Sequence, residues 1–292
     1  MGDIFYMNTF APVKPVTTYA DQINILKRRG LILNDQECLE FLKRVNYYKL
    51  TAYLLPFRNI EGKYLPGTTF SQIKGIYDFE GELRQEIYGI IGQIEISLKA
   101  KFAYYFAHTY GPLGYLDSNN YSPRHNAVKF QEQINKCIAE QHQTPVVQHH
   151  NNKYGGKFPI WVIIEFFSIG MLSRFYSDMK MADKKAIART YFNTTPNNLS
   201  SWLRCFTDLR NMCAHYSRLY YWIFTAIPLF HQPPANVNLR SLFSQILVLK
   251  YLYPTDDWEC FRQKLSNMVT KYQSSIDLNH IGFPANWYDL LG

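Results

Sequence analysis

The sequence lacks any pattern of cysteines that forms a disulfide framework or a zinc site. Its five cysteines are odd in number and widely spaced, with no C-x-x-C pair: Cys38, Cys137, Cys205, Cys213 and Cys260. Zinc sites and small disulfide-rich domains both need closely spaced or paired cysteines. The spacing therefore predicts buried, reduced thiols.

Long apolar runs are also missing. The longest apolar region, "WVIIEFFSIGMLSRFY", is interrupted by Glu165 and Arg174 and is too short for a membrane span. The segment "MGDIFYMNTF" lacks the basic region and apolar stretch of a secretory signal, and Tyr6 stands where a myristoylation motif needs Ser or Thr. We therefore expect a cytoplasmic protein without a membrane partner.

Repeats, low-complexity tracts and the alternation typical of strands are absent as well, and helical patterns dominate. In the segment 78–108, apolar residues recur at a helical period and include Leu83, Ile87, Ile94 and Leu98. The sequence predicts an all-α fold: a helical bundle core with smaller flanking helical parts. The expected division is a basic helical part over 1–72, the core over 73–232 and C-terminal helices over 233–292.

Start and stop signals place the other helices. Thr and Asp residues precede a helix that ends at Gly30, and Asn34 is a candidate cap for the next one. A polar loop is expected within 148–159. Further helices are expected at about 126–142, 159–178, 181–192, 195–222, 239–252 and 256–275.

The net charge favours an anionic partner. Lys and Arg number 31 against 23 Asp and Glu, a net charge of +8, and an excess of this size favours nucleic acid. In "ILKRRG", Lys27, Arg28 and Arg29 are candidate RNA contacts, with Tyr47 and Tyr48 as candidate stacking partners. The alternative is that these cations are merely solvated and the tyrosines belong to the core.

The stretch "DLRNMCAHYSRLYYW", residues 208–222, concentrates polar groups on one side of an expected helix. At 100° per residue, Arg204, His215 and Arg218 lie within roughly 40° of Asn211, with Asp208 beside them. Arg210 projects from the flank, and its long stem can bring the guanidinium to the same face. An ordinary solvated face is the alternative, although such faces are usually mixtures of Lys and Glu.

This set of side chains suits RNA cleavage. Attack of a ribose 2′-OH on the adjacent phosphate needs a base, an acid and cations, and His and Arg supply these functions near neutral pH. Neither a metal nor another cofactor is required for this chemistry. A two-fold homodimer that pairs this face with itself would supply two histidines, one for each proton transfer.

The segment "LRNMCAHYSRLYY" resembles the signature of the Abi family, the abortive-infection proteins of the AbiD/AbiF type. Arg210, four intervening residues and His215 fit the R-x(4–6)-H motif of the HEPN superfamily. The blocks "RVNYYKLTAYLLPFR", "PIWVIIEFFSIGMLSRFY" and "LRSLFSQILVLKYLYP" are similar to other family blocks, in order, so that the resemblance covers roughly residues 20–270.

The resemblance implies an all-α HEPN-type core and a metal-independent endoribonuclease of a bacterial anti-phage system, held by a small structured RNA in a toxin–antitoxin arrangement. Carried over, Arg210 and His215 form the catalytic pair, and Asn211 orients one of them or the phosphate. Arg204 and Arg218 are the candidate phosphate contacts. A second motif is not evident, because Lys101 precedes His108 where the motif needs Arg, so a two-histidine site requires a dimer.

Three acidic residues are candidate supports for this site. Glu95 lies four residues before Lys99 and either forms a surface ion pair with it or contacts Arg210. Glu165 falls in an otherwise apolar helix and, if buried, needs a cationic partner such as Arg204 or Arg210. Asp208 is the single acid on the polar face.

A metal site in "QHQTPVVQHHNN" is not favoured. His142, His149 and His150 follow Cys137 and Glu140, but the spacing fits no known zinc pattern. Two functions compete with the nuclease: a non-catalytic RNA-binding module and a helical protein-interaction adaptor of a defence system. Loss of cleavage in a His215 variant separates the first of these from the nuclease.

Overall fold

The computed structural model describes residues 13–253, 255 and 257–292. Within these residues, regular structure is helical throughout and β pairing is limited to three isolated bridges, which confirms the predicted all-α fold. The chain forms two compact units, divided between Tyr77 and Asp78. The three-part division expected from the sequence stays a prediction.

The first unit holds three short helices and a turn-rich connection. Its elements are α1 (Tyr19–Arg28), α2 (Asp35–Leu42), α3 (Tyr47–Leu54), the 3-10 turn η1 (Leu55–Phe57) and the first turns of α4 (Phe70–Tyr110). The predicted caps are confirmed: the side chain of Thr18 accepts a hydrogen bond from the N–H of Asp21, and that of Asn34 accepts one from Glu37. Gly30, at φ 92°, ends the turn after α1, where a residue with a Cβ would be strained.

A short hairpin-like segment follows η1 and is tied to the end of α1. Arg58 and Tyr64 pair in an antiparallel bridge, and the N–H of Asn59 donates to the carbonyl of Lys63 at 2.8 Å. The N–H of Tyr64 donates to the carbonyl of Arg29 at 2.6 Å. These bonds bring Arg29 next to the Arg58–Tyr64 bridge, although Arg29 lies far from both residues in the sequence.

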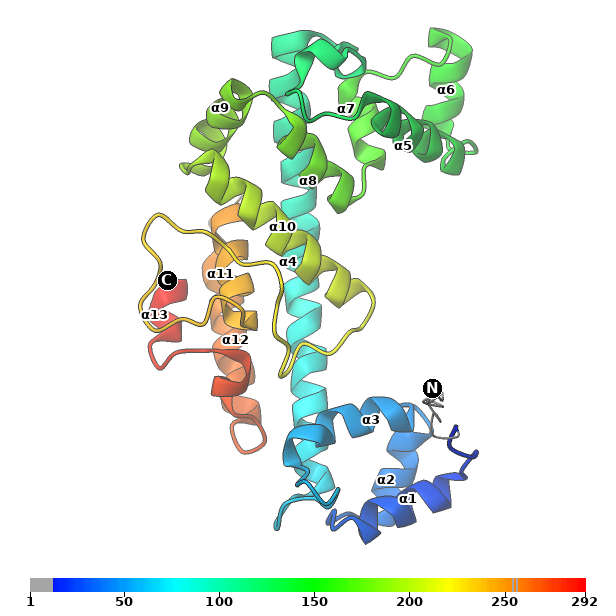
Figure 1. Ribbon diagram of the computed structural model, residues 1–292, viewed down its shortest axis with the longest axis vertical. Helices are drawn as coiled ribbons and strands as arrows, with labels where there is room; N and C mark the ends of the chain where they lie inside the picture. Colours follow the sequence, from blue (N-terminus) through cyan, green and yellow to red (C-terminus); the bar gives the residue numbers. More distant parts are fainter. Residues whose placement is uncertain (1–12, 254, 256) are drawn as a thin grey trace, which may run out of the picture. The chain divides into compact units, whose positions relative to one another are not determined.

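The second unit contains the remaining helices (Figure 1). After α4 they are α5 (Ala127–Glu140), α6 (Pro145–Tyr154), α7 (Ile160–Ile163), α8 (Ile169–Asp178), α9 (Met181–Phe192), α10 (Pro196–Ala214), α11 (Leu242–Leu252), α12 (Trp258–Tyr272) and α13 (Trp287–Leu291). Four 3-10 turns connect them: η2 (Gly114–Leu116), η3 (Ser118–Asn120), η4 (Ile164–Phe166) and η5 (Leu278–Ile281).

Helix α10 lies at the centre of the second unit, because it packs against α8, α9 and α11. The surrounding core is rich in aromatic rings. Phe175 lies 5.0 Å from Phe106 and 6.0 Å from Phe130, measured between ring centroids. Fully buried aromatic side chains include Phe79, Phe102, Phe167, Phe206, Phe224 and Phe243. Burial of this many large rings is the main stabilising contribution to the unit.

Between residues 145 and 178, two sequence-based expectations differ from the structure. The helix expected over 159–178 breaks at 164–168, because the side chain of Ser168 accepts a hydrogen bond from the N–H of Met171 and starts α8 anew. Most of the polar segment expected to be a loop is helix α6, which begins at Pro145 and ends at the left-handed Gly155.

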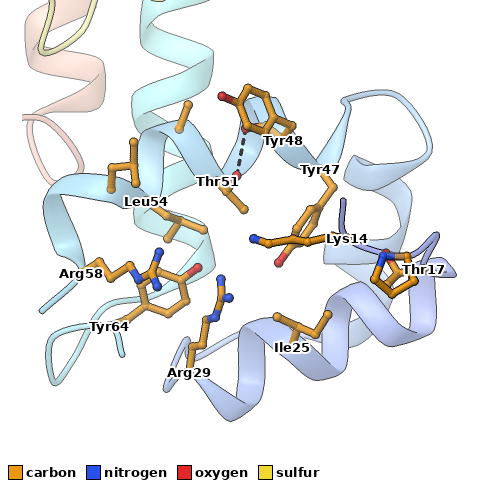
Figure 2. Close-up of a pocket in the computed structure, with 13 residues that line it drawn as sticks. Lys14, Thr17, Ile25, Arg29, Tyr47, Tyr48, Thr51, Leu54, Arg58 and Tyr64 are labelled. Carbon is orange, nitrogen blue, oxygen red and sulfur yellow. Dashed lines mark hydrogen bonds between the residues drawn. The ribbon is translucent and has the colours of Figure 1, made fainter. Parts of the chain in front are cut away.

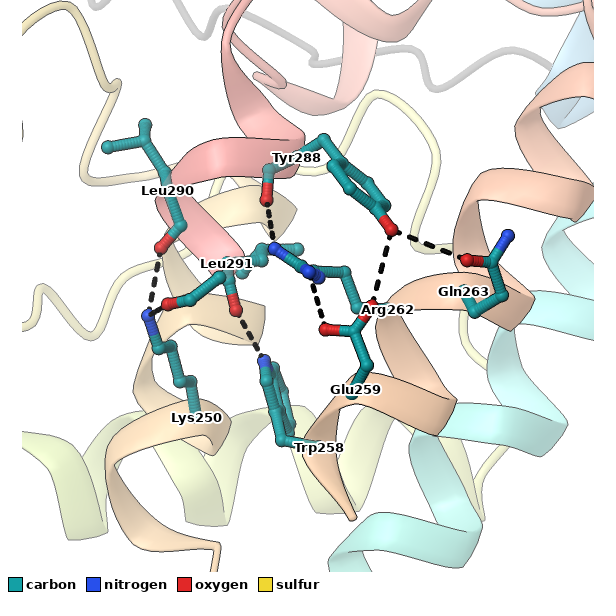
Figure 3. A network of polar contacts seen from close by, with 9 residues as sticks. Lys250, Trp258, Glu259, Arg262, Gln263, Tyr288, Leu290 and Leu291 are labelled. Atoms are coloured by element: carbon teal, nitrogen blue, oxygen red, sulfur yellow. Dashed lines mark hydrogen bonds and ion pairs between the residues drawn. The ribbon is translucent and has the colours of Figure 1, made fainter. Parts of the chain in front are cut away.

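The last helices are joined by polar contacts (Figure 3). The guanidinium of Arg262 pairs with Glu259 at 2.5 Å and stacks on the ring of Tyr288, 4.2 Å from its centroid. Trp258 Nε1 donates to the carbonyl of Leu291 at 2.8 Å, and Lys250 Nζ donates to that of Leu290 at 3.2 Å. The carbonyls of α13 are thereby satisfied by side chains of α11 and α12.

The cysteines are all free, and four of the five are at least partly buried. Burial raises the pKa of Cys205 and of Cys213 to about 12, so both thiols stay protonated at neutral pH. The prediction of buried thiols was wrong for Cys260, which is exposed on α12. None of the helices within the described ranges is long and apolar enough to cross a membrane.

The N-terminal cap of α10 can be tested by substitution. The side chain of Thr195 accepts a hydrogen bond from the N–H of Asn198 at 3.2 Å. We expect Thr195→Ala to lower the free energy of unfolding by about 1 kcal/mol, because one N–H of the first turn loses its partner. Thr195→Ser keeps the hydroxyl and should unfold close to the parent's temperature. Equal thermal midpoints for the Ala and Ser variants would contradict this role of the cap.

Candidate functional site

The polar and apolar sides of α10 separate as the sequence predicts. Leu203, Phe206 and Leu209 are buried against the neighbouring helices. Arg204 and Asn211 are exposed on the other side, and Asp208 is half-buried between them. The packing of its apolar side fixes α10 in place, so that Arg204 and Asn211 face outward.

The predicted continuation of this helix to residue 222 was wrong, because α10 ends at Ala214 and His215 is its C-cap. The N–H of Ser217 donates to the carbonyl of Met212 and that of Tyr216 to Cys213, a Schellman motif with Tyr216 in the left-handed conformation at φ 51°. His215 therefore stays near Asn211, whereas Arg218 lies in the loop beyond the helix.

The three candidate catalytic residues lie at the exposed end of α10. His215 and Asn211 are exposed, and the N–H of His215 donates to the carbonyl of Asn211 at 2.9 Å. Arg210 is half-buried, and its Nη1 donates to Oδ1 of Asn211 at 3.3 Å. The imidazole of His215 has no hydrogen-bond or ion-pair partner within the described part of the chain. Its ring nitrogens are accessible to a ligand from solvent.

A buried ion pair on α4, which sequence analysis missed, holds the segment around His215. Glu80 and Arg84 are 2% and 5% exposed and pair with each other. Arg84 donates to the carbonyl of Met212 at 3.0 Å and to that of Ser217 at 2.7 Å. The second carboxylate oxygen of Glu80 accepts from the N–H of Tyr220 at 2.8 Å. Backbone groups on both sides of His215 are thus fixed to α4.

The sequence does contain a signal for this pair. Glu80 and Arg84 are spaced i, i+4 and fall on the same helical stripe as Ile87, Ile91 and Ile94, which are buried. Charged residues are almost never fully buried unless they are paired. An i, i+4 pair of opposite charges in line with an apolar stripe therefore indicates a buried ion pair.

A pocket of about 280 Å³ lies where the end of α10 meets α4. It is lined by Arg84, Gln85 and Tyr88 of α4 and by Cys213, Ala214 and Tyr216 at the end of α10. The Arg84 guanidinium lies 5.5 Å from the centroid of the Tyr216 ring. Ala214 contributes only a small side chain to the wall of this space. Cys213 contributes a neutral thiol, since burial raises its pKa to about 12.

Within the described residues, Glu95 and Glu165 form no hydrogen bond or ion pair with Arg210 or His215. Glu95 pairs with Lys99 at 3.0 Å, the i, i+4 alternative considered above, and Lys99 also donates to the carbonyl of Glu165 at 2.9 Å. Glu165 is exposed, because the break after α7 places it in η4 at the surface, so it does not need the cationic partner expected for a buried carboxylate. Asp208 accepts a hydrogen bond from Thr225 at 3.5 Å.

The basic residues predicted to contact RNA from the N-terminal part lie in the first unit. Lys27 forms an ion pair with Asp35, and Arg28 Nε donates to the carbonyl of Asn24 at 3.4 Å. Arg29 lines a pocket of that unit. In the ranges that the structure describes, no three His, Cys, Asp or Glu side chains are grouped to hold a metal ion.

Removing Arg84 tests the buried pair. We expect Arg84→Met to lower the free energy of unfolding by about 3–5 kcal/mol, because Glu80 keeps an uncompensated charge inside the protein. Lys271→Met breaks an exposed ion pair with Glu82 and provides a matched control, with a much smaller expected cost, because water screens an exposed pair. Chemical denaturation measures both. Similar losses in the two variants would show that the buried pair has no special role.

The left-handed residue Tyr216 allows a second test. Glycine adopts a positive φ without strain, whereas an L residue at φ 51° has its Cβ close to the following carbonyl. We expect Tyr216→Gly to be more stable than Tyr216→Ala by about 1 kcal/mol. Both variants lose the aromatic ring, so the difference isolates the backbone. A Gly variant less stable than the Ala variant by thermal denaturation would contradict the left-handed assignment.

Comparison with known proteins gives one family match. Residues 40–221, more than half of the chain, match the family model described as Abi-like protein. No curated protein and no solved structure matches the chain. The matched range contains Glu80, Arg84 and the whole of α10 with His215. The chain therefore belongs to the Abi-like family of abortive-infection proteins.

Proposed function

We propose that the protein is a metal-independent endoribonuclease that acts as the effector of an anti-phage abortive-infection system. The observation that carries the proposal is the exposed His215, bonded through its backbone to Asn211, which also accepts a hydrogen bond from Arg210, on a segment whose backbone is fixed by buried Arg84. Membership of the Abi-like family supports the defence role.

The proposed reaction is transesterification within the RNA strand. One histidine removes the proton from a ribose 2′-OH, and the 2′ oxygen attacks the adjacent phosphorus. The bond from phosphorus to the 5′ oxygen breaks, and a second histidine gives a proton to that oxygen. The products are a 2′,3′-cyclic phosphate and a 5′-hydroxyl end. Histidine is suited to both proton transfers because it titrates near neutral pH.

In this proposal, Arg210 stabilises the negative charge that develops on the phosphate. Its planar guanidinium matches two phosphate oxygens, and Asn211 orients it through the hydrogen bond at 3.3 Å. Arg204, exposed on the same helix, and Arg218 in the following loop contact neighbouring phosphates. Because one chain brings one such Arg–His motif, the two histidines come from two copies in a homodimer.

Cleavage by the His215→Ala variant tests the proposal. In EDTA, the purified protein should cut single-stranded RNA and leave cyclic phosphate ends. We expect His215→Ala to lower the rate by about 100- to 10,000-fold, the usual contribution of a general acid or base. His231→Ala, which alters another exposed histidine outside the site, should cleave at the parent rate.

Two results would favour the competing functions. RNA binding with strong salt dependence but no cleavage by the parent protein would indicate a non-catalytic RNA-binding module. RNA affinity that does not change in Arg204→Glu and Arg218→Glu would favour a protein-interaction adaptor. Sequencing of RNA that copurifies with the protein identifies a cognate small RNA, if the toxin–antitoxin arrangement applies.

A further inference from the structure

The first unit contains a second pocket, of about 600 Å³, that the proposed nuclease reaction does not use (Figure 2). Its walls come from the segment before α1, from α1, from α3 and from the Arg58–Tyr64 bridge. Pockets for small ligands usually measure about 300–1,000 Å³. The pocket is therefore large enough for a small organic ligand.

The charged groups of this pocket are all positive. Lys14, Arg29 and Arg58 line it, and none of its lining residues is acidic. Within the described residues these three cations have no carboxylate partner, whereas the nearby Lys27 and Lys43 pair with Asp35 and Glu40. Figure 2 shows the Lys14 ammonium and the Arg29 guanidinium directed into the same space. Such a pocket attracts an anion.

Two tyrosine hydroxyls face the same space and remain able to donate hydrogen bonds. The Tyr47 hydroxyl is buried and has no partner in the described part of the chain. Burial raises the pKa of Tyr47 and of Tyr64, although Arg29 opposes the shift in both. Both hydroxyls therefore stay protonated at neutral pH. A buried donor without a partner is costly unless a ligand accepts its hydrogen bond.

The two arginines are held in place by the backbone. The carbonyl of Arg29 accepts the N–H of Tyr64, which fixes the end of α1 against the bridge. The Arg58 guanidinium lies over Gly62, where a Cβ would come within 2.5 Å of its Nη2. Gly62, at φ 83°, thus leaves the room that Arg58 occupies. Local structure therefore sets the backbone position of Arg29 and the room for the Arg58 guanidinium.

An aromatic ring completes the site. Tyr48 lines the pocket, yet 82% of its surface is exposed, so one ring face is open to a planar ligand. Bases of RNA and free nucleotides stack on such rings, while arginines bind their phosphates. We propose that this pocket binds a nucleotide, with its phosphate between Arg29, Arg58 and Lys14 and its base against Tyr48.

The proposal does not depend on the nuclease function and leaves two sources for the ligand. A free mononucleotide and the phosphorylated 5′ end of an RNA strand present the same phosphate and base. Binding of 5′-AMP, adenosine and inorganic phosphate to the full chain can be measured by calorimetry. We expect 5′-AMP to bind at least tenfold more tightly than adenosine, because adenosine lacks the anion.

Substitutions of the pocket residues show which side chains contact 5′-AMP. Arg29→Gln and Arg58→Gln should each weaken 5′-AMP binding at least tenfold, since each removes a charge-assisted hydrogen bond. Tyr48→Ala should weaken binding of 5′-AMP but leave that of inorganic phosphate unchanged. Arg44→Gln is the matched control, because Arg44 is an exposed arginine of the same unit that does not line the pocket. Circular dichroism confirms that the variants are folded.

A short RNA with and without a 5′ phosphate distinguishes the two sources. Tighter binding of the phosphorylated RNA than of 5′-AMP identifies an RNA end, and the reverse order identifies a free nucleotide. Either order supports the proposed binding site, provided that Arg29→Gln weakens binding of the tighter ligand. The proposal is overturned if neither 5′-AMP nor the phosphorylated RNA binds, or if both bind the Arg29 and Arg58 variants as tightly as the parent.

Discussion

The buried charge pair of Glu80 and Arg84 determines where the end of α10 lies. Two charges with exposed fractions of 2% and 5% are stable inside a protein only if both are paired and hydrogen-bonded. Here Arg84 binds two backbone carbonyls and Glu80 binds a backbone N–H, all three on the segment 212–220. The pair therefore connects α4 to the chain on either side of His215.

The end of α10 combines a fixed backbone with the accessible side chain of His215. The Schellman motif and the Arg84 contacts fix the backbone from Met212 to Ser217, while His215 itself is exposed. Catalytic groups need such placement, because a general base must lie within hydrogen-bonding distance of the proton it removes. The left-handed Tyr216 fits this pattern, since strained backbone residues occur at functional sites when the surrounding structure holds them.

Much of the fold could be predicted from the sequence, because helix caps and apolar periodicity are properties of short segments. Thr18, Asn34 and the outward side of α10 follow from such rules. The end of α10 does not, because its stop is a tyrosine in place of the usual glycine and is held by Arg84, 128 residues from Met212. The pocket of the first unit could not be predicted either, since Arg29 and Arg58 are brought together by the backbone pairing of Tyr64.

The distribution of the cysteines has a practical consequence for spectroscopy. Cys38, Cys205 and Cys213 are buried and Cys137 is half-buried, which leaves Cys260 on α12 as the exposed thiol. A maleimide dye or a nitroxide label reacts with accessible thiolates, and burial keeps the other thiols protonated and shielded. Cys260 is therefore the most accessible attachment point for a fluorescent or spin label, and the half-buried Cys137 comes next.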